Sequence, residues 1–229
     1  MLQFHEEEEM YISRITLKED ARQTNKFWDI FNNEYSLHQA VWDLFGDKPD
    51  RERDFLYRME SLGKYPVVYT VSKRRPEDRH DLWNIESKDY DPKVKKDMRL
   101  GFALRVNPTR KRDGKRHDVV MDRKHKIRLE NDNGKKESKS LAELVTEACL
   151  IWLKERSEKK GFQVLMTRAE GYRQSQFLKK KGGMFVRYST VDFSGMLQVL
   201  DEHVFRNVLF EGLGPGKGFG CGLMLVRKS

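Results

Sequence analysis

Residues 36–45 read SLHQAVWDLF, and the apolar side chains of this stretch recur at helical spacing. Five of them stand at positions i, i+3, i+4, i+7 and i+8, and so share one face of a helix. They are Leu37, Ala40, Val41, Leu44 and Phe45. A glycine and a proline follow closely and are expected to end the helix.

Strands are predicted on both sides of this helix. Tyr11–Leu17 (YISRITL) alternates between apolar and polar side chains, which is typical of a strand with one buried face. After the helix, Phe55–Met59 and Val67–Val71 read as two further strands, separated by a Gly-Lys-Tyr-Pro turn. The order strand, helix, strand, strand is that of the first part of a ferredoxin-like unit.

A similar order of elements recurs in the second half of the chain. We predict a strand, a helix, a group of strands, a helix and a final strand, over residues 100–106, 140–155, 163–167, 176–178, 184–193, 201–210 and 223–226. Residues 76–96 are too charged for an assignment. The chain is therefore predicted to be an α+β protein of two tandem ferredoxin-like domains with antiparallel sheets, over residues 10–95 and 98–229.

Composition narrows the class of protein. Among 229 residues, 45 Lys and Arg against 36 Asp and Glu give a net charge of +9 and a pI near 9.4. This excess favours an anionic polymer as partner, because each neutralised phosphate releases condensed counterions. We expect residues 1–9, which precede a second methionine, to be a leader outside the fold, either an addition to the chain or a start-site artefact.

Cysteine and histidine spacing gives further expectations. Cys149 and Cys221 stand far apart, with no C-x-x-C and no histidines at metal spacing. We therefore expect reduced thiols, a cytoplasmic protein, no metal site and no cofactor. No apolar stretch approaches the ~20 residues of a membrane helix, so no membrane association is expected.

Every second residue from 212 to 222 is glycine (GLGPGKGFGCG). In an extended backbone one face of this segment would carry no side chains, and a phosphate backbone or a helix could lie against it; positive φ angles would equally require glycine. Glu211 stands where a P-loop has its first glycine and Gly218 where it has Ser or Thr, and no dinucleotide fingerprint fits. We predict a platform for RNA or for domain packing, with Lys217 as its phosphate contact; a turn that only lets the last strand pack is the alternative. The glycines are Gly212, Gly214, Gly216, Gly218, Gly220 and Gly222.

Basic residues gather at 93–99, 105–128, 154–160 and 179–181. The last cluster lies in a Lys-Lys-Lys-Gly-Gly turn, and a cationic hairpin tip is narrow enough to enter an RNA groove. A solvated charged surface is the alternative for the other clusters. The predicted RNA contacts are Arg105, Lys111, Arg112, Lys115, Arg116, Lys179, Lys180, Lys181 and Lys217.

His38 is the histidine with a suggestive neighbour. It follows Tyr35 by three residues, so both lie on one side of the helix near its N-terminal end, where backbone N–H groups favour an anion. A histidine and a tyrosine beside a basic surface suit metal-independent RNA cleavage, in which a 2′-OH attacks the adjacent phosphate. The alternative is a histidine that makes a structural hydrogen bond.

Four segments together resemble a known family. They are the run from Tyr35 to Phe45, the motif RDFLYR at 53–58, the motif LRVNP at 104–108, and the stretch from Leu209 through the glycines to Leu225. In this order they resemble the CasE endoribonucleases, which process CRISPR precursor RNA in type I-E systems.

The resemblance implies two tandem domains of the RAMP superfamily and cleavage at the 3′ base of the CRISPR repeat stem-loop, with a 2′,3′-cyclic phosphate product. It also implies that the product, the mature crRNA, is retained within the Cascade complex. His38 matches the catalytic histidine and Tyr35 the nearby tyrosine. Asp43 and Gly46 stand where some members have a lysine and a serine, so another cation, Lys217 or a loop arginine, would have to stabilise the phosphorane. A non-catalytic RAMP-type RNA-binding subunit and a ribosome-associated basic protein are the alternatives.

Overall fold

The computed structural model describes residues 9–24, 30, 34–46, 53–62, 65–132, 139–178 and 185–228. Its contacts divide the chain into two compact units. The first comprises Met1–Pro92 together with Gly218–Gly220, and the second comprises Lys93–Lys217 together with Cys221–Ser229. Three residues of the glycine-rich segment thus belong to the first unit.

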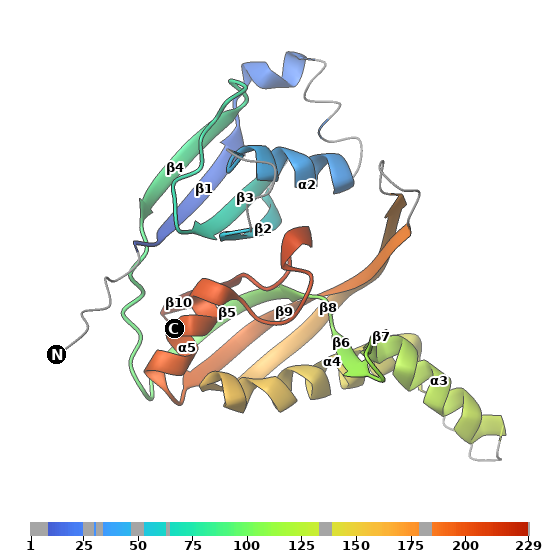
Figure 1. Ribbon diagram of the computed structural model, residues 1–229. Coiled ribbons are helices and arrows are strands. Elements are labelled where there is room, and N and C mark those ends of the chain that lie inside the picture. Colours follow the sequence, from blue (N-terminus) through green and yellow to red (C-terminus); the bar gives the residue numbers. More distant parts are fainter. Residues whose placement is uncertain are drawn as a thin grey trace. The chain divides into compact units, whose positions relative to one another are not determined.

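The first unit contains a four-stranded antiparallel sheet in the order β2-β3-β1-β4 (Figure 1). The strands are β1 (Tyr11–Leu17), β2 (Phe55–Leu62), β3 (Tyr65–Ser72) and β4 (Trp83–Asp89). A short 3₁₀ turn, η1 (Asp20–Gln23), follows β1, and helix α2 (Glu34–Asp43) precedes β2. Tyr65 and Pro66, predicted to be part of a turn, instead pair in β3, because the two strands continue to Leu62 opposite Tyr65.

Helix α2 forms the core of this unit with the sheet. All five residues of its predicted apolar face are at most 7% exposed, which confirms the helix. The helix ends at Asp43, two residues earlier than predicted, and the turn after it packs on β2, where the rings of Phe45 and Phe55 stack with centroids 4.2 Å apart. Ile15 and Val68 contribute from the neighbouring strands. The close packing of α2 on β2 brings the polar positions of both elements near each other.

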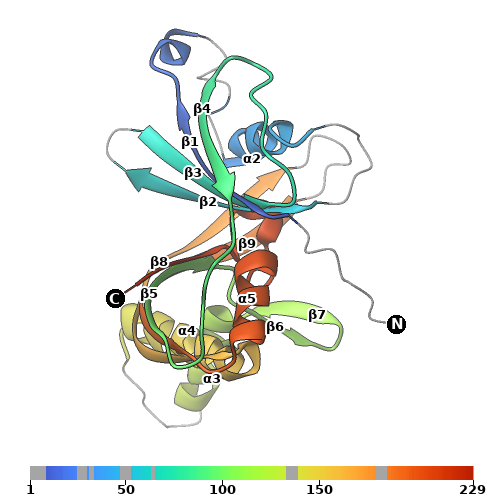
Figure 2. The same cartoon turned by 90° about the vertical axis from the view of Figure 1, so that its left-hand side faces the viewer.

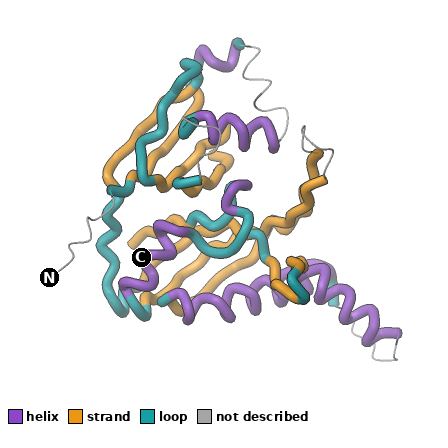
Figure 3. The backbone as a smooth tube through the Cα atoms, viewed as in Figure 1, coloured by secondary structure: helices purple, strands orange, loops and turns teal. Residues whose placement is uncertain are grey.

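Strand β4 lies in the charged stretch that the sequence left unassigned. It pairs with β1 from Leu17 opposite Trp83 to Tyr11 opposite Asp89. Only its first residue, Trp83, is fully buried, because β4 is an edge strand with mostly polar side chains. Residues 73–82, all of which are described, connect β3 to β4 without a helix (Figure 3). This loop takes the place of the second helix of a ferredoxin-like unit.

The second unit contains both helices of such a unit, which are labelled α4 and α5 in Figure 2. Its sheet has the order β10-β5-β9-β8, with all pairs antiparallel (Figure 1). The elements are β5 (Arg99–Val106), α4 (Leu141–Ser157), η2 (Glu158–Lys160), β8 (Phe162–Leu178), β9 (Phe185–Val199), α5 (Glu202–Glu211), η3 (Lys217–Phe219) and β10 (Met224–Lys228). Ser140 caps α4 in a reciprocal capping box with Glu143. Trp152, Phe162 and Phe205 are completely buried in the core. The two sheets confirm the predicted α+β fold class.

Two parts of the second unit differ from the prediction. The strands predicted at 163–167 and 176–178 are one continuous strand, β8, whose register shifts twice where it bulges. The basic stretch after β5, predicted to be a loop, contains the hairpin β6 (Thr109–Arg112) and β7 (Lys115–Asp118) and the helix α3 (Val119–Asp132). Dense charge conceals the periodicity of α3, whose start is marked by Asp118 accepting hydrogen bonds from two backbone N–H groups of its first turn.

Candidate active site

His38 lies among aromatic side chains of the first unit. It projects from α2 and is half-buried, with its ring centroid 5.6 Å from that of Trp42 and 5.3 Å from that of Phe219. Its Nδ1 lies 3.4 Å from the hydroxyl oxygen of Tyr57 on β2. The helix, the strand and the glycine-rich segment therefore meet at one imidazole.

Tyr57 connects this histidine to the glycine-rich segment. Its side chain is 5% exposed, and its hydroxyl donates a hydrogen bond to the carbonyl oxygen of Gly218 at 3.2 Å. Gly220 lies against the tyrosine ring with φ +75°, and a Cβ on it would come within 3.1 Å of Tyr57 Cε2. Both the backbone angle and the close approach require glycine at this position.

The surroundings keep His38 neutral. Burial lowers the pKa of His38 from 6.5 to about 4; a hydrogen bond with the Gly218 backbone opposes this shift, and the nearby Arg53 guanidinium adds to it. At neutral pH the imidazole is therefore uncharged, and it can accept a proton.

Arg53 stands just before β2 and is half-buried. Burial also lowers its pKa, and its Nε is a buried donor without a hydrogen-bond partner among the described residues. Its Nη1 lies 3.5 Å from the position that a Cβ of Gly218 would take, and His38 Cε1 lies 3.9 Å from the same point. The guanidinium and the imidazole thus converge on one small volume.

Neither Tyr57 nor Arg53 was predicted individually from the sequence. Both fall inside the motif RDFLYR, but Tyr57 occupies an inward position of an alternating strand and reads as a core residue. We expected Lys217 or a loop arginine to stabilise the phosphorane, without specifying which arginine. The sequence carried no further signal, because the partners of both residues come from the glycine-rich segment far along the chain.

The other predicted catalytic residue and the predicted hairpin tip lie beyond what the structure describes. Tyr35 is in the first turn of α2, but its side chain is outside the described part. Lys179, Lys180 and Lys181 fall between the described ranges of β8 and β9. Their roles stay predictions.

The glycine-rich segment is not extended, contrary to the first expectation. Five of its six glycines have positive φ angles, of 76°, 78°, 80°, 75° and 96°; they are Gly212, Gly214, Gly216, Gly220 and Gly222. The chain therefore winds through turns rather than presenting one bare face. Within the second unit, Gly214 lies on the Trp152 ring, where a Cβ would approach to 3.1 Å, so a helix does lie against it. Lys217, in η3, is half-buried and its stem lies along Gly222.

The predicted RNA contacts of the second unit fall into two groups. Arg105 holds Asp192 in an ion pair, with Nη2 2.8 Å from Oδ2, so its charge is already balanced within the sheet. Four others are exposed on the hairpin β6–β7; they are Lys111, Arg112, Lys115 and Arg116. In the hairpin Lys111 faces Arg116 and Arg112 faces Lys115. Arg112 is also paired with Asp122 at 3.3 Å, so its charge is partly balanced. Like charges directly opposite each other destabilise a sheet, and the pair Lys111 and Arg116 therefore favours an anionic partner here.

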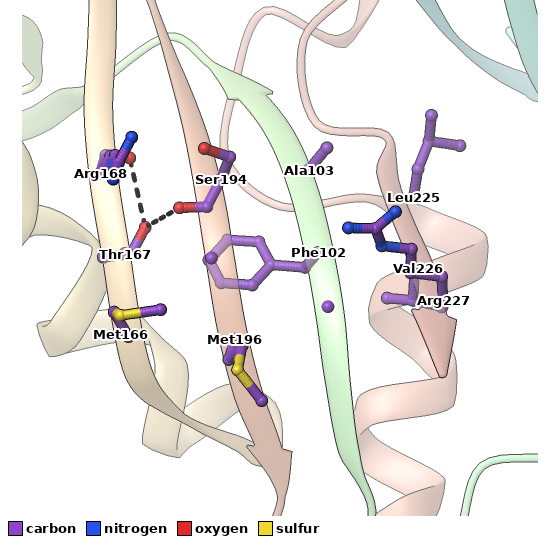
Figure 4. Close-up of a pocket in the computed structure, with 12 residues that line it drawn as sticks. Phe102, Ala103, Met166, Thr167, Arg168, Ser194, Met196, Leu225, Val226 and Arg227 are labelled. Carbon is purple, nitrogen blue, oxygen red and sulfur yellow. Dashed lines mark hydrogen bonds between the residues drawn. The ribbon is translucent and has the colours of Figure 1, made fainter. Parts of the chain in front are cut away.

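Two grooves lie on the second unit. One, of about 670 Å³, runs beside the hairpin and is lined by Arg116, Arg187, Gln174, Gln176 and Tyr188 among others. The other, of about 630 Å³, crosses the four strands of the sheet, and Thr167 and Ser194 are joined there by a hydrogen bond of 3.1 Å (Figure 4). The lining of the second groove includes methionines and arginines but no carboxylate, histidine or cysteine. The first groove has two arginines, Arg116 and Arg187, together with amides and the carboxylate of Asp118, so it is the more polar of the two.

No group of three or more His, Cys, Asp or Glu that could hold a metal ion occurs within the described ranges. Both cysteines are buried as free thiols. Among the helices of the described ranges, none is long and apolar enough to cross a membrane.

Comparison with known proteins agrees with this architecture. A family model described as CRISPR associated protein matches residues 10–228. The Cascade subunit CasE of Escherichia coli is 27% identical over 192 residues, covering 83% of this chain and 89% of the relative. The endoribonuclease Cse3 of Thermus thermophilus is 27% identical over 238 residues, covering 95% and 99%.

The fold has solved counterparts as well. A structure of the endoribonuclease Cse3 bound to a 19-nucleotide RNA superposes with a TM-score of 0.71 at 23% identity, covering 96% of this chain and 99% of the other. The family model matches nearly the whole chain, and the two four-stranded antiparallel sheets agree with this match. The chain belongs to the CRISPR-associated protein family of CasE and Cse3.

Proposed function

We propose that this protein is a metal-independent endoribonuclease that cleaves CRISPR repeat RNA, with His38 as the residue that moves the proton. The observation that carries the proposal is the neutral, half-buried His38, held between Tyr57 and the Gly218 segment. The kinship with an endoribonuclease supports the same reaction class.

In the proposed reaction, the 2′-OH of one nucleotide attacks the adjacent phosphorus. The O2′–P bond forms, the P–O5′ bond breaks, and the products are a 2′,3′-cyclic phosphate and a 5′-OH. The 2′-OH loses one proton and the 5′-oxygen gains one, so the step is balanced without a metal or an oxidant. A neutral imidazole suits the removal of the first proton.

Tyr57 would orient the imidazole. When Tyr57 gives its hydrogen to the Gly218 carbonyl, its oxygen is left to accept from Nδ1–H of His38, and Nε2 then carries the lone pair that takes the proton. Tyr35, one turn before His38, is proposed to contact the phosphate or orient the RNA.

RNA binding is proposed for the hairpin β6–β7 and its neighbouring groove, with the predicted tip Lys179–Lys181 entering a groove of the repeat stem. The opposed cations of the hairpin and the arginines and glutamines of the groove support this. The cut is proposed at the 3′ base of the stem. Because the Escherichia coli relative is a Cascade subunit, we propose that the product stays bound within such a complex.

The test is cleavage of the repeat RNA from the same genome in the presence of EDTA, with mapping of both new ends. The expected products carry a 2′,3′-cyclic phosphate and a 5′-OH. An RNA with a single 2′-deoxy nucleotide at the cut is the matched control, and it should bind but stay intact. Tight binding of an RNA that is never cut would instead assign a non-catalytic RNA-binding subunit. Failure to bind the repeat would favour a different basic protein, such as one associated with the ribosome.

A further inference from the structure

Arg53 is an arginine whose charge is not balanced inside the described part of the protein. Other arginines of the first unit have carboxylate partners: Arg58 pairs with Glu60, and Arg74 pairs with Asp54 at 2.8 Å. No ion pair joins Arg53 to any described residue, and its buried Nε lacks a hydrogen-bond partner there. A partly desolvated guanidinium without a counterion is costly, unless an anion from outside completes it.

Gly218 leaves space beside this guanidinium. Of the six glycines in the segment 212–222, all of which are described, Gly218 is the one without a positive φ angle. A Cβ there would meet Arg53 Nη1 at 3.5 Å and His38 Cε1 at 3.9 Å, which are ordinary contact distances. The backbone therefore does not require glycine at this position. The missing side chain leaves open the volume on which the guanidinium and the imidazole converge.

We propose that Arg53 is a catalytic residue that binds the scissile phosphate in this volume, beside His38, and stabilises the phosphorane. The inference rests on the proposed function, because it places the phosphate of the RNA within reach of His38. Some members of the family that the sequence resembles have a lysine and a serine at the positions of Asp43 and Gly46. Arg53 would supply the positive charge that this chain lacks at those positions.

The chemistry requires such a cation. When the 2′-oxygen adds to phosphorus, the phosphate passes from one negative charge to two on its non-bridging oxygens. A guanidinium N–H that donates to one of these oxygens is worth more in the five-coordinate state than in the ground state, because the charge there is greater. Nη1 lies beside the open volume, and no hydrogen bond joins it to another residue of the described ranges, so it can donate to the phosphate; no proton leaves the arginine.

The experiment compares single-turnover cleavage and binding of the 2′-deoxy RNA for wild type, Arg53→Gln and Arg53→Lys. The loss expected for Arg53→Gln is about 10²–10³-fold in the cleavage rate, with a change of only a few fold in Kd. Arg53→Lys should recover part of the rate, because it restores the charge but not the planar donors. Arg75→Gln, which removes an exposed arginine paired with Asp89, is the matched control and should cleave normally.

Gly218→Ala supplies a second variant that does not touch the charge. The added methyl group fits the backbone but occupies the open volume, so cleavage should fall at least tenfold while the thermal unfolding temperature stays unchanged. Wild-type rates for both Arg53→Gln and Gly218→Ala would overturn the assignment of Arg53 and leave the proposed function standing. A wild-type protein that binds the repeat without cutting it would instead remove the proposed function itself.

Discussion

The His38 site and the hairpin β6–β7 differ in how far their charged and titratable side chains are exposed to solvent. Around His38 one arginine and one neutral imidazole are half-buried, and their surroundings are aromatic. In the hairpin four cations are exposed to solvent and face each other in like-charged pairs, and Arg112 is also paired with Asp122. Desolvated charges act strongly over short distances, whereas exposed charges are screened by salt. We therefore expect the first region to control the rate of cleavage and the second to control the affinity for RNA.

The largest effect should come from His38. His38→Ala removes the proton acceptor and should lower the single-turnover cleavage rate by about 10²–10⁴-fold, while RNA affinity changes little. His203, which is 91% exposed, provides the control, and His203→Ala should cleave at the wild-type rate. If loss of His38 weakened binding and left the rate at saturation unchanged, the division between the two regions would be wrong.

Gly220 allows backbone strain to be separated from an effect on the site. Gly220 and Gly114 both have φ +75°, but a Cβ on Gly220 would press on the Tyr57 ring, whereas a Cβ on Gly114 would meet nothing within 4 Å. Replacement by alanine should cost about 1–2 kcal/mol at Gly114 in urea unfolding, and more at Gly220. Only Gly220→Ala should slow cleavage, by roughly tenfold. Equal rates for the two variants would show that the contact with Tyr57 does not matter for the reaction.

The hairpin offers the complementary test. The double change Lys111→Gln with Arg116→Gln should weaken RNA binding by about tenfold near 0.15 M salt, and it should reduce the slope of log K against log salt by about one for each phosphate that is no longer neutralised. The cleavage rate at saturating protein should stay unchanged. The control is Arg14→Gln with Lys88→Gln, two exposed positions of the first unit. An equal loss of affinity in this control would mean that net charge, rather than the hairpin, sets the affinity.

The smallest effect is expected from pH. Because the pKa of His38 is about 4 in the folded protein and 6.5 is its ordinary value, the unfolded chain binds the proton more readily. The contribution of His38 to stability should thus be complete above about pH 6.5 and be lost as the pH falls toward 4. Since the imidazole is neutral throughout, cleavage should vary less than twofold between pH 6 and 8. NMR titration of His38 gives its pKa directly, and a steady fall in rate with rising pH would indicate a protonated acid instead.

The sequence predicted the elements whose patterns were set by a buried face. Helix α2 and strand β1 each bury one side against the core, and their periodicity is clear. Strand β4 was missed because, at the edge of the sheet, it buries little beyond Trp83. Helix α3 was missed because its charged residues extend around most of its surface.

The candidate site was predictable only in part, for a related reason. His38 was identified because it follows Tyr35 by three residues near the N-terminal end of a clearly periodic helix. Arg53 and Tyr57 acquire their roles from Gly218 and Gly220, more than 150 residues further along the chain. Nothing in the local pattern indicates such a distant contact. The glycine spacing itself fitted both an extended backbone and a series of turns, and the positive φ angles decide for turns.

The division of the chain has a consequence for how the protein is made. Gly218–Gly220 belong by their contacts to the unit that is otherwise formed by Met1–Pro92. A nascent chain that has released strands β1 to β4 from the ribosome therefore still lacks the carbonyl that Tyr57 binds and the ring that flanks His38. On the proposed mechanism, activity would begin only once residue 220 has left the ribosome. A gene fragment that encodes Met1–Pro92 alone would not produce an active nuclease.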